Sequence, residues 1–282
     1  MQIQQLKKYF FEELQAVFPE TEINTFYHWL LEDFLQMKPV DAILNKTQRL
    51  TEEEEKQFKS AVERLKKQEP IQYILGKTEF YGYEFTVNPS VLIPRPETEE
   101  LVDWIIKDHQ GEKHLQVVDF CTGSACIAVS LSKNLWQSQV TAVDVSPQAL
   151  EVAQVNAKNL AAEINFIESD VLQLDDFPKN QYDVIVSNPP YVRNLEKVEI
   201  KPNVLKYEPE IALFVADEDP LVFYQKITEI AKTSLKSGGS LYFEINQYLA
   251  EETKALVEQI GFTKVTLKKD IFNNFRMLKA TR

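Results

Sequence analysis

The sequence has few cysteines, no long apolar run and no excess of basic side chains. Its two cysteines, Cys121 and Cys126, are too few for a disulfide framework and have no metal-ligand companions nearby, which favours a reducing cytoplasm and no metal site. No stretch is long enough to cross a bilayer. The start, MQIQQLKKYFFEEL, has the spacing of an amphipathic helix rather than the pattern of a signal peptide.

The charge balance is acidic, with 31 basic and 43 acidic side chains and a net charge of −12. Repulsion from a phosphate backbone opposes binding to bare nucleic acid unless a local basic patch overrides it. We therefore expect a protein or small-molecule substrate and no direct nucleic-acid binding. The length of 282 residues is enough for two domains.

Residues 1–69 are predicted to form a small helical bundle, because apolar residues recur there at helical spacing. Thr51 and Glu54 have the spacing of a capping box, which begins one of the helices. The apolar positions of the three helices are Leu6, Tyr9, Phe10, Leu14 and Val17, then Phe26, Trp29, Leu30, Phe34 and Leu35, and last Phe58, Ala61, Val62 and Leu65. No chemistry is visible in this part, and such a bundle is more often a docking or scaffolding unit than a catalytic one.

The pattern changes at Pro70. Residues 70–94 carry aromatic and β-branched residues punctuated by glycine and proline, which predicts a β-hairpin connector. From residue 95 to 282, strands and amphipathic helices alternate, with strands at LQVVDF, QVTAVD, INFI, YDVIVS and SLYFEI and a final strand pair at VTLKK and RMLKA. This alternation predicts an α/β fold with a parallel sheet covered on both faces.

In such a sheet, ligands bind beyond the carboxyl ends of the strands. The first candidate is the strand-to-helix turn of VVDFCTGSAC, where small residues let a ligand approach the backbone and the helix N-terminus. Only Gly123 of the usual three glycines is present, and Cys121 and Ala125 occupy the other two places. On its own this turn is better explained by local geometry, because many strand-to-helix turns contain one glycine.

Two aspartates follow the next strands. Asp144 closes the strand QVTAVD, where a carboxylate can accept hydrogen bonds from both hydroxyls of a ribose. The following Ser146 and Pro147 are typical of a helix start, which accounts for Ser146 without accounting for Asp144. Asp170 follows INFI, and a ligand contact and a plain turn aspartate are equally open for it.

The strongest candidate is SNPPY, residues 187–191, directly after the strand YDVIV. Asn-Pro-Pro is elsewhere a rigid turn. At the end of a strand in a nucleotide-binding sheet, it presents one amide and one aromatic ring to the ligand cleft, on a backbone stiffened by two prolines.

These groups match the needs of a planar amino acceptor, whose nitrogen lone pair is delocalised. Its two N–H groups can donate to the Asn188 side-chain oxygen and to the Pro189 carbonyl, and Tyr191 can stack on the planar group. Catalysis then rests on orientation and preorganised acceptors, without a charged base before transfer.

Several stretches together resemble the PrmC/HemK family, the peptide chain release factor N5-glutamine methyltransferases. They are PIQYILGKTEFYGYEFTVNPSVLIPRPETEELV, VVDFCTGSACIAVSLS, TAVDVSPQALEVAQVNA, VIVSNPPYV, KYEPEIAL and LKSGGSLYFEI, in family order. NPPY alone is shared with adenine-N6 methyltransferases, and its combination with IPRPETE and YEPEIAL is far more specific. The helical N-terminus also fits the family.

The resemblance implies a Rossmann-like class I S-adenosylmethionine-dependent methyltransferase domain and release factors as protein partners. We expect residues 1–69 to form a substrate-recognition domain, because a side-chain amide offers few contacts and selectivity has to come from surface remote from the reacting nitrogen. The alternative is a domain that only covers the sheet edge and adds stability.

The resemblance also implies that Arg95, Pro96 and Glu97 lie near the cleft, without a role that we can assign. The implied cofactor contacts are Cys121, Thr122, Gly123, Ser124 and Ala125 for the methionine end, Asp144 for the ribose, Asp170 and Val171 beside the adenine, and Asn188. The implied substrate contacts are Asn188, Pro189, Pro190 and Tyr191.

The sequence departs from the family at two places. Cys121 and Ala125 replace glycines, and IFNNFR stands where a Gly-Asn-Asp-Arg type of turn is expected. Two other functions remain to be weighed. An adenine-N6 DNA or RNA methyltransferase uses the same kind of pocket, but the acidic charge and the lack of a Lys- and Arg-rich recognition domain argue against it. A cofactor-binding structural protein is opposed by the intact NPPY.

Overall fold

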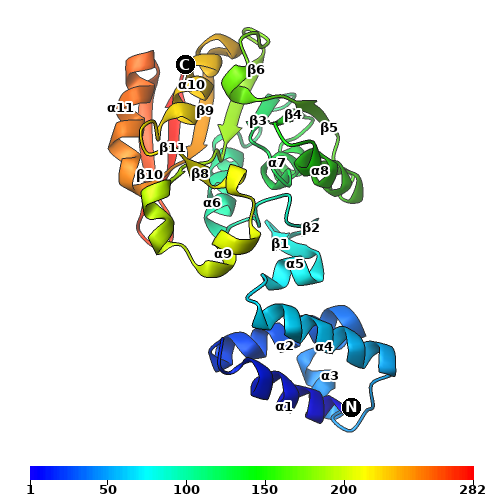
Figure 1. The fold of residues 1–282 in the computed structure, drawn as a ribbon. Helices are drawn as coiled ribbons and strands as arrows, with labels where there is room; N and C mark the ends of the chain where they lie inside the picture. The colour runs from blue at the N-terminus through cyan, green and yellow to red at the C-terminus, as the bar shows by residue number, and fades with distance from the viewer. The chain divides into compact units, whose positions relative to one another are not determined.

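The computed structural model describes residues 1–282, and these residues form two compact units that are described separately. Unit 1 consists of Met1–Gly76 together with Lys201–Tyr207, and unit 2 of Lys77–Ile200 together with Glu208–Arg282. Figure 1 shows the helices of Met1–Gly76 in blue and cyan, the segment Lys201–Tyr207 in yellow, and the central sheet of unit 2. None of the helices combines the length and the apolar character needed to span a membrane.

Unit 1 is helical throughout, and its amphipathic helices share one apolar core. Phe10 from the first helix packs edge-on against Tyr27 of the second and Phe58 of the fourth, with ring centroids 5.5 and 6.1 Å apart. The helices are α1 (Ile3–Leu14), α2 (Glu20–Leu35), α3 (Pro39–Leu44), α4 (Glu52–Lys66), α5 (Ile71–Leu75) and α9 (Pro202–Tyr207). Burial of the apolar faces of α1, α2, α4 and α5 is the main force that stabilises the bundle, whereas α9 contributes no buried side chain.

The ends of two helices show how local sequence shapes unit 1. The capping box predicted at α4 is confirmed, because Thr51 Oγ1 accepts from the Glu54 amide and the Glu54 carboxylate accepts from the Thr51 amide. The prediction was wrong at Val17, which follows the end of α1 and is partly exposed. Helix α9 joins the unit through the Tyr207 hydroxyl, which donates to the Lys67 carbonyl at 2.9 Å.

Unit 2 begins with the hairpin β1 (Lys77–Phe80) and β2 (Tyr83–Thr86). Its two-residue turn has positive φ at both Tyr81 and Gly82, the backbone twist that two-residue hairpins favour. The Tyr81 amide donates to Glu99, and Asn156 exchanges two hydrogen bonds with the backbone of Thr86. The hairpin is therefore fastened to two helices of unit 2.

The main sheet has seven strands in the order β10-β11-β9-β6-β3-β4-β5. They are β3 (Gln116–Phe120), β4 (Gln139–Asp144), β5 (Ile164–Glu168), β6 (Tyr182–Ser187), β9 (Leu235–Glu244), β10 (Thr263–Lys269) and β11 (Phe275–Thr281). The α/β fold is confirmed, and the predicted parallel sheet is present from β9 to β5, whereas the predicted final strand pair adds antiparallel pairing. Strand β11 runs antiparallel to both neighbours. The short turn after β10 can join β10 to β11 only in antiparallel orientation.

Helices cover both faces of this sheet, as the sequence predicted. Neighbouring residues of β3 show the two sides, because Val117 packs into the core on one face and Val118 into the core on the other. Helices α6 (Pro96–Asp108), α7 (Cys126–Asn134) and α8 (Pro147–Asn159) cover the first face, and α10 (Val222–Ser234) and α11 (Ala250–Ile260) the second (Figure 1).

The remaining elements of unit 2 are short. Strand β7 (Val192–Arg193) directly follows the SNPPY segment and pairs in parallel with β8 (Phe214–Val215). The single-turn helices are η1 (Val171–Gln173), η2 (Asn194–Glu199), η3 (Glu210–Ala212) and η4 (Gln247–Leu249). The chain thus leaves unit 2 after η2, contributes α9 to unit 1, and returns at Glu208.

Candidate active site

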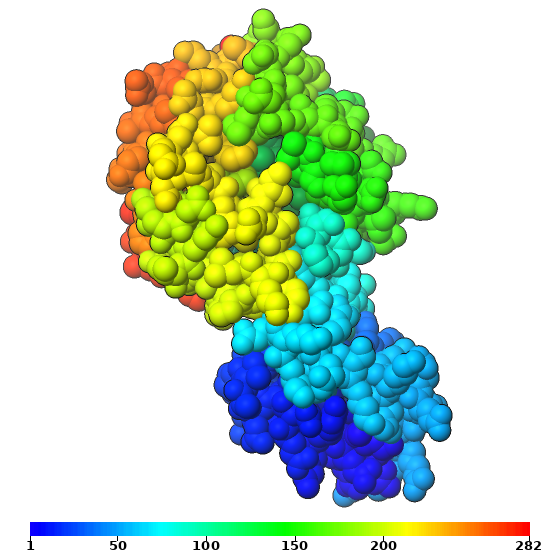
Figure 2. All heavy atoms as spheres, in the orientation of Figure 1, coloured from blue at the N-terminus to red at the C-terminus, as the bar shows by residue number.

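A cavity of about 290 Å³ lies at the carboxyl ends of β3, β4 and β6. The register brings these ends level, because Phe120 pairs with Val143 on one side and with Ser187 on the other. Figure 2 shows the surface of unit 2 hollowed between its green and yellow segments. This is the position at which parallel α/β sheets bind their ligands.

The turn after β3 forms one wall of the cavity. Cys121, Gly123 and Ala125 all have positive φ, at 59°, 54° and 62°. This conformation favours glycine, so the structure explains why three glycines are usual in such a turn. Burial raises the pKa of the Cys121 thiol and raises that of Cys126 to about 12, so both thiols stay protonated at neutral pH.

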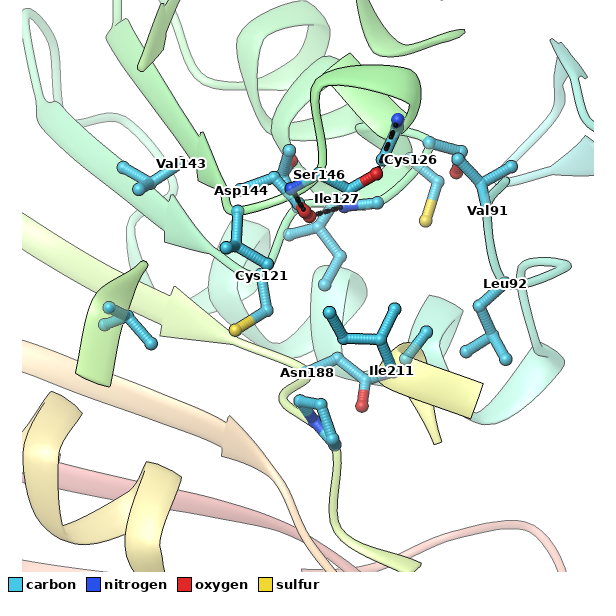
Figure 3. A pocket seen from close by; sticks show the side chains of 18 of the residues that line it. Val91, Leu92, Cys121, Cys126, Ile127, Val143, Asp144, Ser146, Asn188 and Ile211 are labelled. Atoms are coloured by element: carbon cyan, nitrogen blue, oxygen red, sulfur yellow. Dashed lines mark hydrogen bonds between the residues drawn. The ribbon is translucent and has the colours of Figure 1, made fainter. Parts of the chain in front are cut away.

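Asp144 ends β4 and faces the same cavity (Figure 3). Its Oδ2 accepts from the Gly123 amide at 2.8 Å and its Oδ1 from the Ser146 amide at 2.9 Å. Burial raises the pKa of Asp144 in spite of these two backbone donors. The predicted cap is also present, since Ser146 Oγ accepts from the Ala149 amide. The carboxylate therefore organises the β3 turn while keeping lone pairs for a ligand.

Asp119 lies in β3, directly before this turn, and was not singled out from the sequence, although it is the one acidic residue within β3. It is fully buried, its Oδ2 accepts from Thr122 Oγ1 at 2.6 Å, and its Oδ1 has no hydrogen-bond partner. Burial raises its pKa to about 7. Asp119 does not itself line the cavity, but it accepts from Thr122, which does.

Asp170 and Val171 also line the cavity, at the start of η1. Asp170 Oδ1 accepts from the Leu172 amide at 2.9 Å, so the turn role that the sequence left open is present together with a place at the cavity wall. Figure 3 shows Cys121, Leu92 and Ile211 around the same space. The apolar residues suit a flat heterocycle, and the carboxylates suit hydroxyl groups.

Asn188 follows β6 and lines the cavity, and its Nδ2 donates to Thr98 Oγ1 at 3.3 Å. Its Oδ1 accepts no hydrogen bond within the protein. Tyr191 is held at both ends, because its hydroxyl donates to Glu244 Oε1 at 2.9 Å and its carbonyl accepts from Asn246 Nδ2. Burial and the carboxylate of Glu244 raise the pKa of Tyr191, so its hydroxyl remains protonated.

Most of the residues chosen from the sequence meet in this cavity. Those that line it are Cys121, Thr122, Gly123, Ser124, Asp144, Asp170, Val171, Asn188 and Pro190. Ala125, Pro189 and Tyr191 do not line it, although each adjoins a residue that does. Of the signature residues near the cleft, Arg95 lines the cavity, and Pro96 and Glu97 do not.

The sequence placed Arg95 near the cleft without a role, and its partner in the YEPE stretch was not predicted. Arg95 donates to Glu208 Oε1 at 2.6 Å, and Glu208 Oε2 accepts from the Ile93 amide at 3.2 Å. This pair joins the two stretches beside the cavity. Buried Asn156 was also missed, and its Nδ2 donates to the Ser124 carbonyl. Each was present in a quoted motif, but only the fold reveals its partner.

Comparisons with known proteins agree with this architecture. The family described as "Methyltransferase small domain" matches residues 98–208, and "PrmC N-terminal domain" matches residues 5–76. A solved methyltransferase from Pyrococcus furiosus shares the fold, with a TM-score of 0.51 and 20% identity over 71% of this chain and 89% of its own. The fold, the position of the cavity and the match to the methyltransferase family together define a class I S-adenosylmethionine-dependent methyltransferase.

Two curated relatives narrow the class. The release factor glutamine methyltransferase of Flavobacterium psychrophilum is 51% identical over 99% of both chains. The protein of that name from Bacteroides thetaiotaomicron is 43% identical over 97% of this chain and 98% of its own. The chain belongs to the family of release factor glutamine methyltransferases, and its cofactor is S-adenosyl-L-methionine.

Proposed function

We propose that this enzyme transfers a methyl group from S-adenosylmethionine to the side-chain amide nitrogen of the glutamine in the Gly-Gly-Gln motif of peptide chain release factors. The observation that carries the proposal is the placement of Asn188. Its amide lies in the cofactor cavity with Nδ2 bonded to Thr98 and Oδ1 free to accept a hydrogen bond. Membership of the family supports the same activity.

The cofactor is held by the strand ends described above. The turn of residues 121–125 holds its methionine end, Asp144 accepts from its ribose, and Asp170 and Val171 lie beside its adenine. When bound, the cofactor supplies an electrophilic methyl group on a positively charged sulfur. The left-handed turn of residues 121–125 and the carboxylate of Asp144 at the cavity wall support this fit.

The acceptor nitrogen is positioned by the SNPPY segment. Asn188 Oδ1 and the Pro189 carbonyl accept from its two N–H groups, which fixes the nitrogen and favours electron density on it. Pro190 lines the cavity, and the ring of its neighbour Tyr191 stacks on the planar amide. The segment is suited to this role because both prolines are buried and Tyr191 is anchored at its hydroxyl and at its carbonyl.

Unit 1 serves in this proposal as the substrate-recognition domain, which binds the body of the release factor. It contains no residue of the cavity, and α3 exposes Val40, Ile43 and Leu44 to solvent. The release factor is the only macromolecular substrate, without direct nucleic-acid binding, as the net charge of −12 favours. The reaction takes place in the cytoplasm, where free thiols such as Cys121 and Cys126 persist.

A radiolabel assay tests the activity. Purified enzyme and tritiated S-adenosylmethionine are offered release factor, DNA, RNA, or no acceptor, with Asn188→Ala as the matched inactive control. We expect label in the release factor alone and almost none with Asn188→Ala. Label in DNA or RNA would support an adenine-N6 methyltransferase instead, and cofactor binding without any labelled acceptor would support a non-catalytic role.

A further inference from the structure

A hydrogen-bonded chain of buried side chains stands behind the acceptor pocket. Asn188 Nδ2 lies 3.3 Å from Thr98 Oγ1, which lies 2.6 Å from Glu244 Oε2. The other carboxylate oxygen, Glu244 Oε1, lies 2.9 Å from the Tyr191 hydroxyl. Thr98 and Glu244 are each only 2% exposed. One carboxylate therefore contacts Tyr191 directly and Asn188 through a single hydroxyl.

The chemistry of these groups fixes the direction of each bond. A carboxylate only accepts hydrogen bonds, so the hydroxyls of Thr98 and Tyr191 must both donate to Glu244. A hydroxyl has one proton, and Thr98 therefore offers only lone pairs to Asn188. The amide group that faces Thr98 must then be the nitrogen, and the Asn188 oxygen must face the other way.

Arg276 supplies a counter-charge for this arrangement. Its Nη1 lies 3.5 Å from the Tyr191 hydroxyl and 3.4 Å from the Ile245 carbonyl, and its Nε lies 3.4 Å from Asp270. The guanidinium has no acceptor atom and always carries its charge. Burial raises the pKa of Glu244, and the guanidinium opposes this shift together with the two hydroxyls that donate to the carboxylate.

We propose that Glu244 and Thr98 are positioning residues, which hold the Asn188 amide with its oxygen toward the acceptor nitrogen and fix Tyr191 against the same carboxylate. This inference rests on the proposed function. Without these hydrogen bonds, the oxygen and the nitrogen of the Asn188 amide could exchange places, because the two groups are nearly equivalent in shape. A flipped amide presents a donor where the substrate also has a donor. Thr98 belongs to the IPRPETE stretch and Glu244 to SLYFEI, so the inference gives both stretches a task.

Single-turnover rates with saturating cofactor and release factor test the role of the hydrogen bonds from Thr98 and Glu244. Thr98→Val removes the hydroxyl at nearly constant shape, and we expect a rate loss of at least about tenfold, because an oriented acceptor is lost. Thr98→Ser keeps the hydroxyl and should restore most of that rate. Thr253→Val is the matched control, since it removes another buried hydroxyl, which donates to the Leu249 carbonyl away from the cavity.

Glu244→Gln provides a second variant. A carboxamide offers one acceptor and one donor group, so it cannot accept from both hydroxyls, and either Thr98 or Tyr191 must turn. We expect a rate loss similar to that of Thr98→Val, with the dissociation constant of the cofactor changed by less than about threefold. Loss of cofactor binding in parallel with rate, or full activity of both variants, would overturn the proposal.

Coupling shows whether Thr98 acts through Asn188. If it does, Thr98→Val should cause little further loss in an Asn188→Ala background, whereas independent roles would give multiplied losses. NMR gives a readout that needs no substrate, using cofactor-bound enzyme labelled with ¹⁵N asparagine. We expect the Asn188 side-chain amide signal, assigned with Asn188→Ala, to shift in Thr98→Val and to stay near its place in Thr98→Ser.

The two readouts separate the possible failures. If wild-type enzyme does not methylate release factor while the NMR signal responds as expected, the proposed function fails and the hydrogen-bonded chain stands. If wild-type enzyme is active while Thr98→Val is fully active and its amide signal does not move, the positioning proposal fails and the function stands.

Discussion

Asp144 performs two tasks with one carboxyl group. It accepts from the backbone amides of Gly123 and Ser146, which shapes the turn beside the cavity, and it faces the cavity as the proposed ribose acceptor. In Asn188 the two ends of the amide have different roles, because the nitrogen donates a hydrogen bond within the protein and the oxygen is free to accept one from the substrate. The two residues should therefore affect different steps.

Cofactor affinity should depend more on Asp144 than on Asn188. Asp144→Ala removes charge-assisted hydrogen bonds to two hydroxyls and loosens the β3 turn, which should cost about 1.5–3 kcal/mol of binding free energy. Asn188→Ala should cost clearly less. Calorimetric titration with S-adenosylmethionine measures both, and equal affinities of the two variants would contradict the ribose assignment.

Asn188→Asp should remain folded and transfer methyl groups much more slowly. The side chain is almost isosteric, but a carboxylate cannot donate to Thr98, and it places a negative charge beside the positive sulfur, which favours bound cofactor over transfer. Single-turnover rates at saturating cofactor are the measurement, and circular dichroism checks the fold. A wild-type rate would mean that Tyr191 and the prolines orient the acceptor without Asn188.

Stability should depend on pH through Asp119. Its pKa is raised to about 7 by burial, against about 3.9 for an exposed aspartate, so the folded state keeps a proton that the unfolded state has lost between these values. The free energy of unfolding should therefore fall as pH rises from about 4 to about 7, and this contribution should change no further above pH 7.

Asp119→Asn isolates that contribution. Asparagine keeps an acceptor for Thr122 but does not titrate, so the stability of the variant relative to wild type should rise with pH across the same window. Urea denaturation of both proteins at several pH values and constant ionic strength gives the difference. A stability difference that does not change with pH would contradict a raised pKa of buried Asp119.

At the scale of elements, the turn between β3 and α7 has a strained backbone. Ala125 has a φ of 62° at the start of α7, and a left-handed conformation costs a residue with a Cβ atom roughly 1–2 kcal/mol. Ala125→Gly removes this cost. It also gives the unfolded chain more conformational freedom, which lowers the free energy of unfolding by about 0.4–1 kcal/mol. We expect a gain in the free energy of unfolding of up to about 1 kcal/mol.

The matched control for this change is Ala128→Gly, inside α7. Ala128 is equally buried, but it lies in regular helix, where glycine costs about 1 kcal/mol relative to alanine. Chemical denaturation of both variants should therefore give changes of opposite sign. Similar losses in the two variants would show that Ala125 is not strained.

The elements themselves could be predicted because their signals are local. Hydrophobic periodicity located the strands β3, β4, β5 and β6, and Thr51 with Glu54 marked the start of α4. What could not be predicted depends on residues that meet only in the fold. Thr98 and Glu244 are 146 residues apart, and Asp119 resembles an ordinary strand residue until its burial is known.

The same limit applies to chain paths. The sequence predicted a recognition domain of residues 1–69, whereas unit 1 extends to Gly76 and also takes up Lys201–Tyr207. That short helix lies between two motifs of unit 2, and its attachment depends on Tyr207 meeting the carbonyl at the end of α4. No periodicity in the sequence indicates such a return.

At the scale of the whole molecule, unit 1 should matter for protein substrates and not for short peptides. Ile43 and Leu44 of α3 are 73% and 76% exposed, and the double change to glutamate should lower kcat/KM for full-length release factor by about tenfold. The value for a Gly-Gly-Gln peptide should not change. Val155→Glu on α8, where Val155 is 45% exposed, is the control. Equal effects on both substrates would contradict a docking role.

The most direct test of the central claim is to locate the transferred methyl group. Release factor is incubated with enzyme and S-adenosylmethionine, digested, and sequenced by mass spectrometry, with Asn188→Ala enzyme in parallel. The account predicts one added CH₂ on the glutamine of Gly-Gly-Gln, as N5-methylglutamine, and none with the variant. A methyl group on another residue, or an unmodified glutamine after complete turnover of the cofactor, would contradict it.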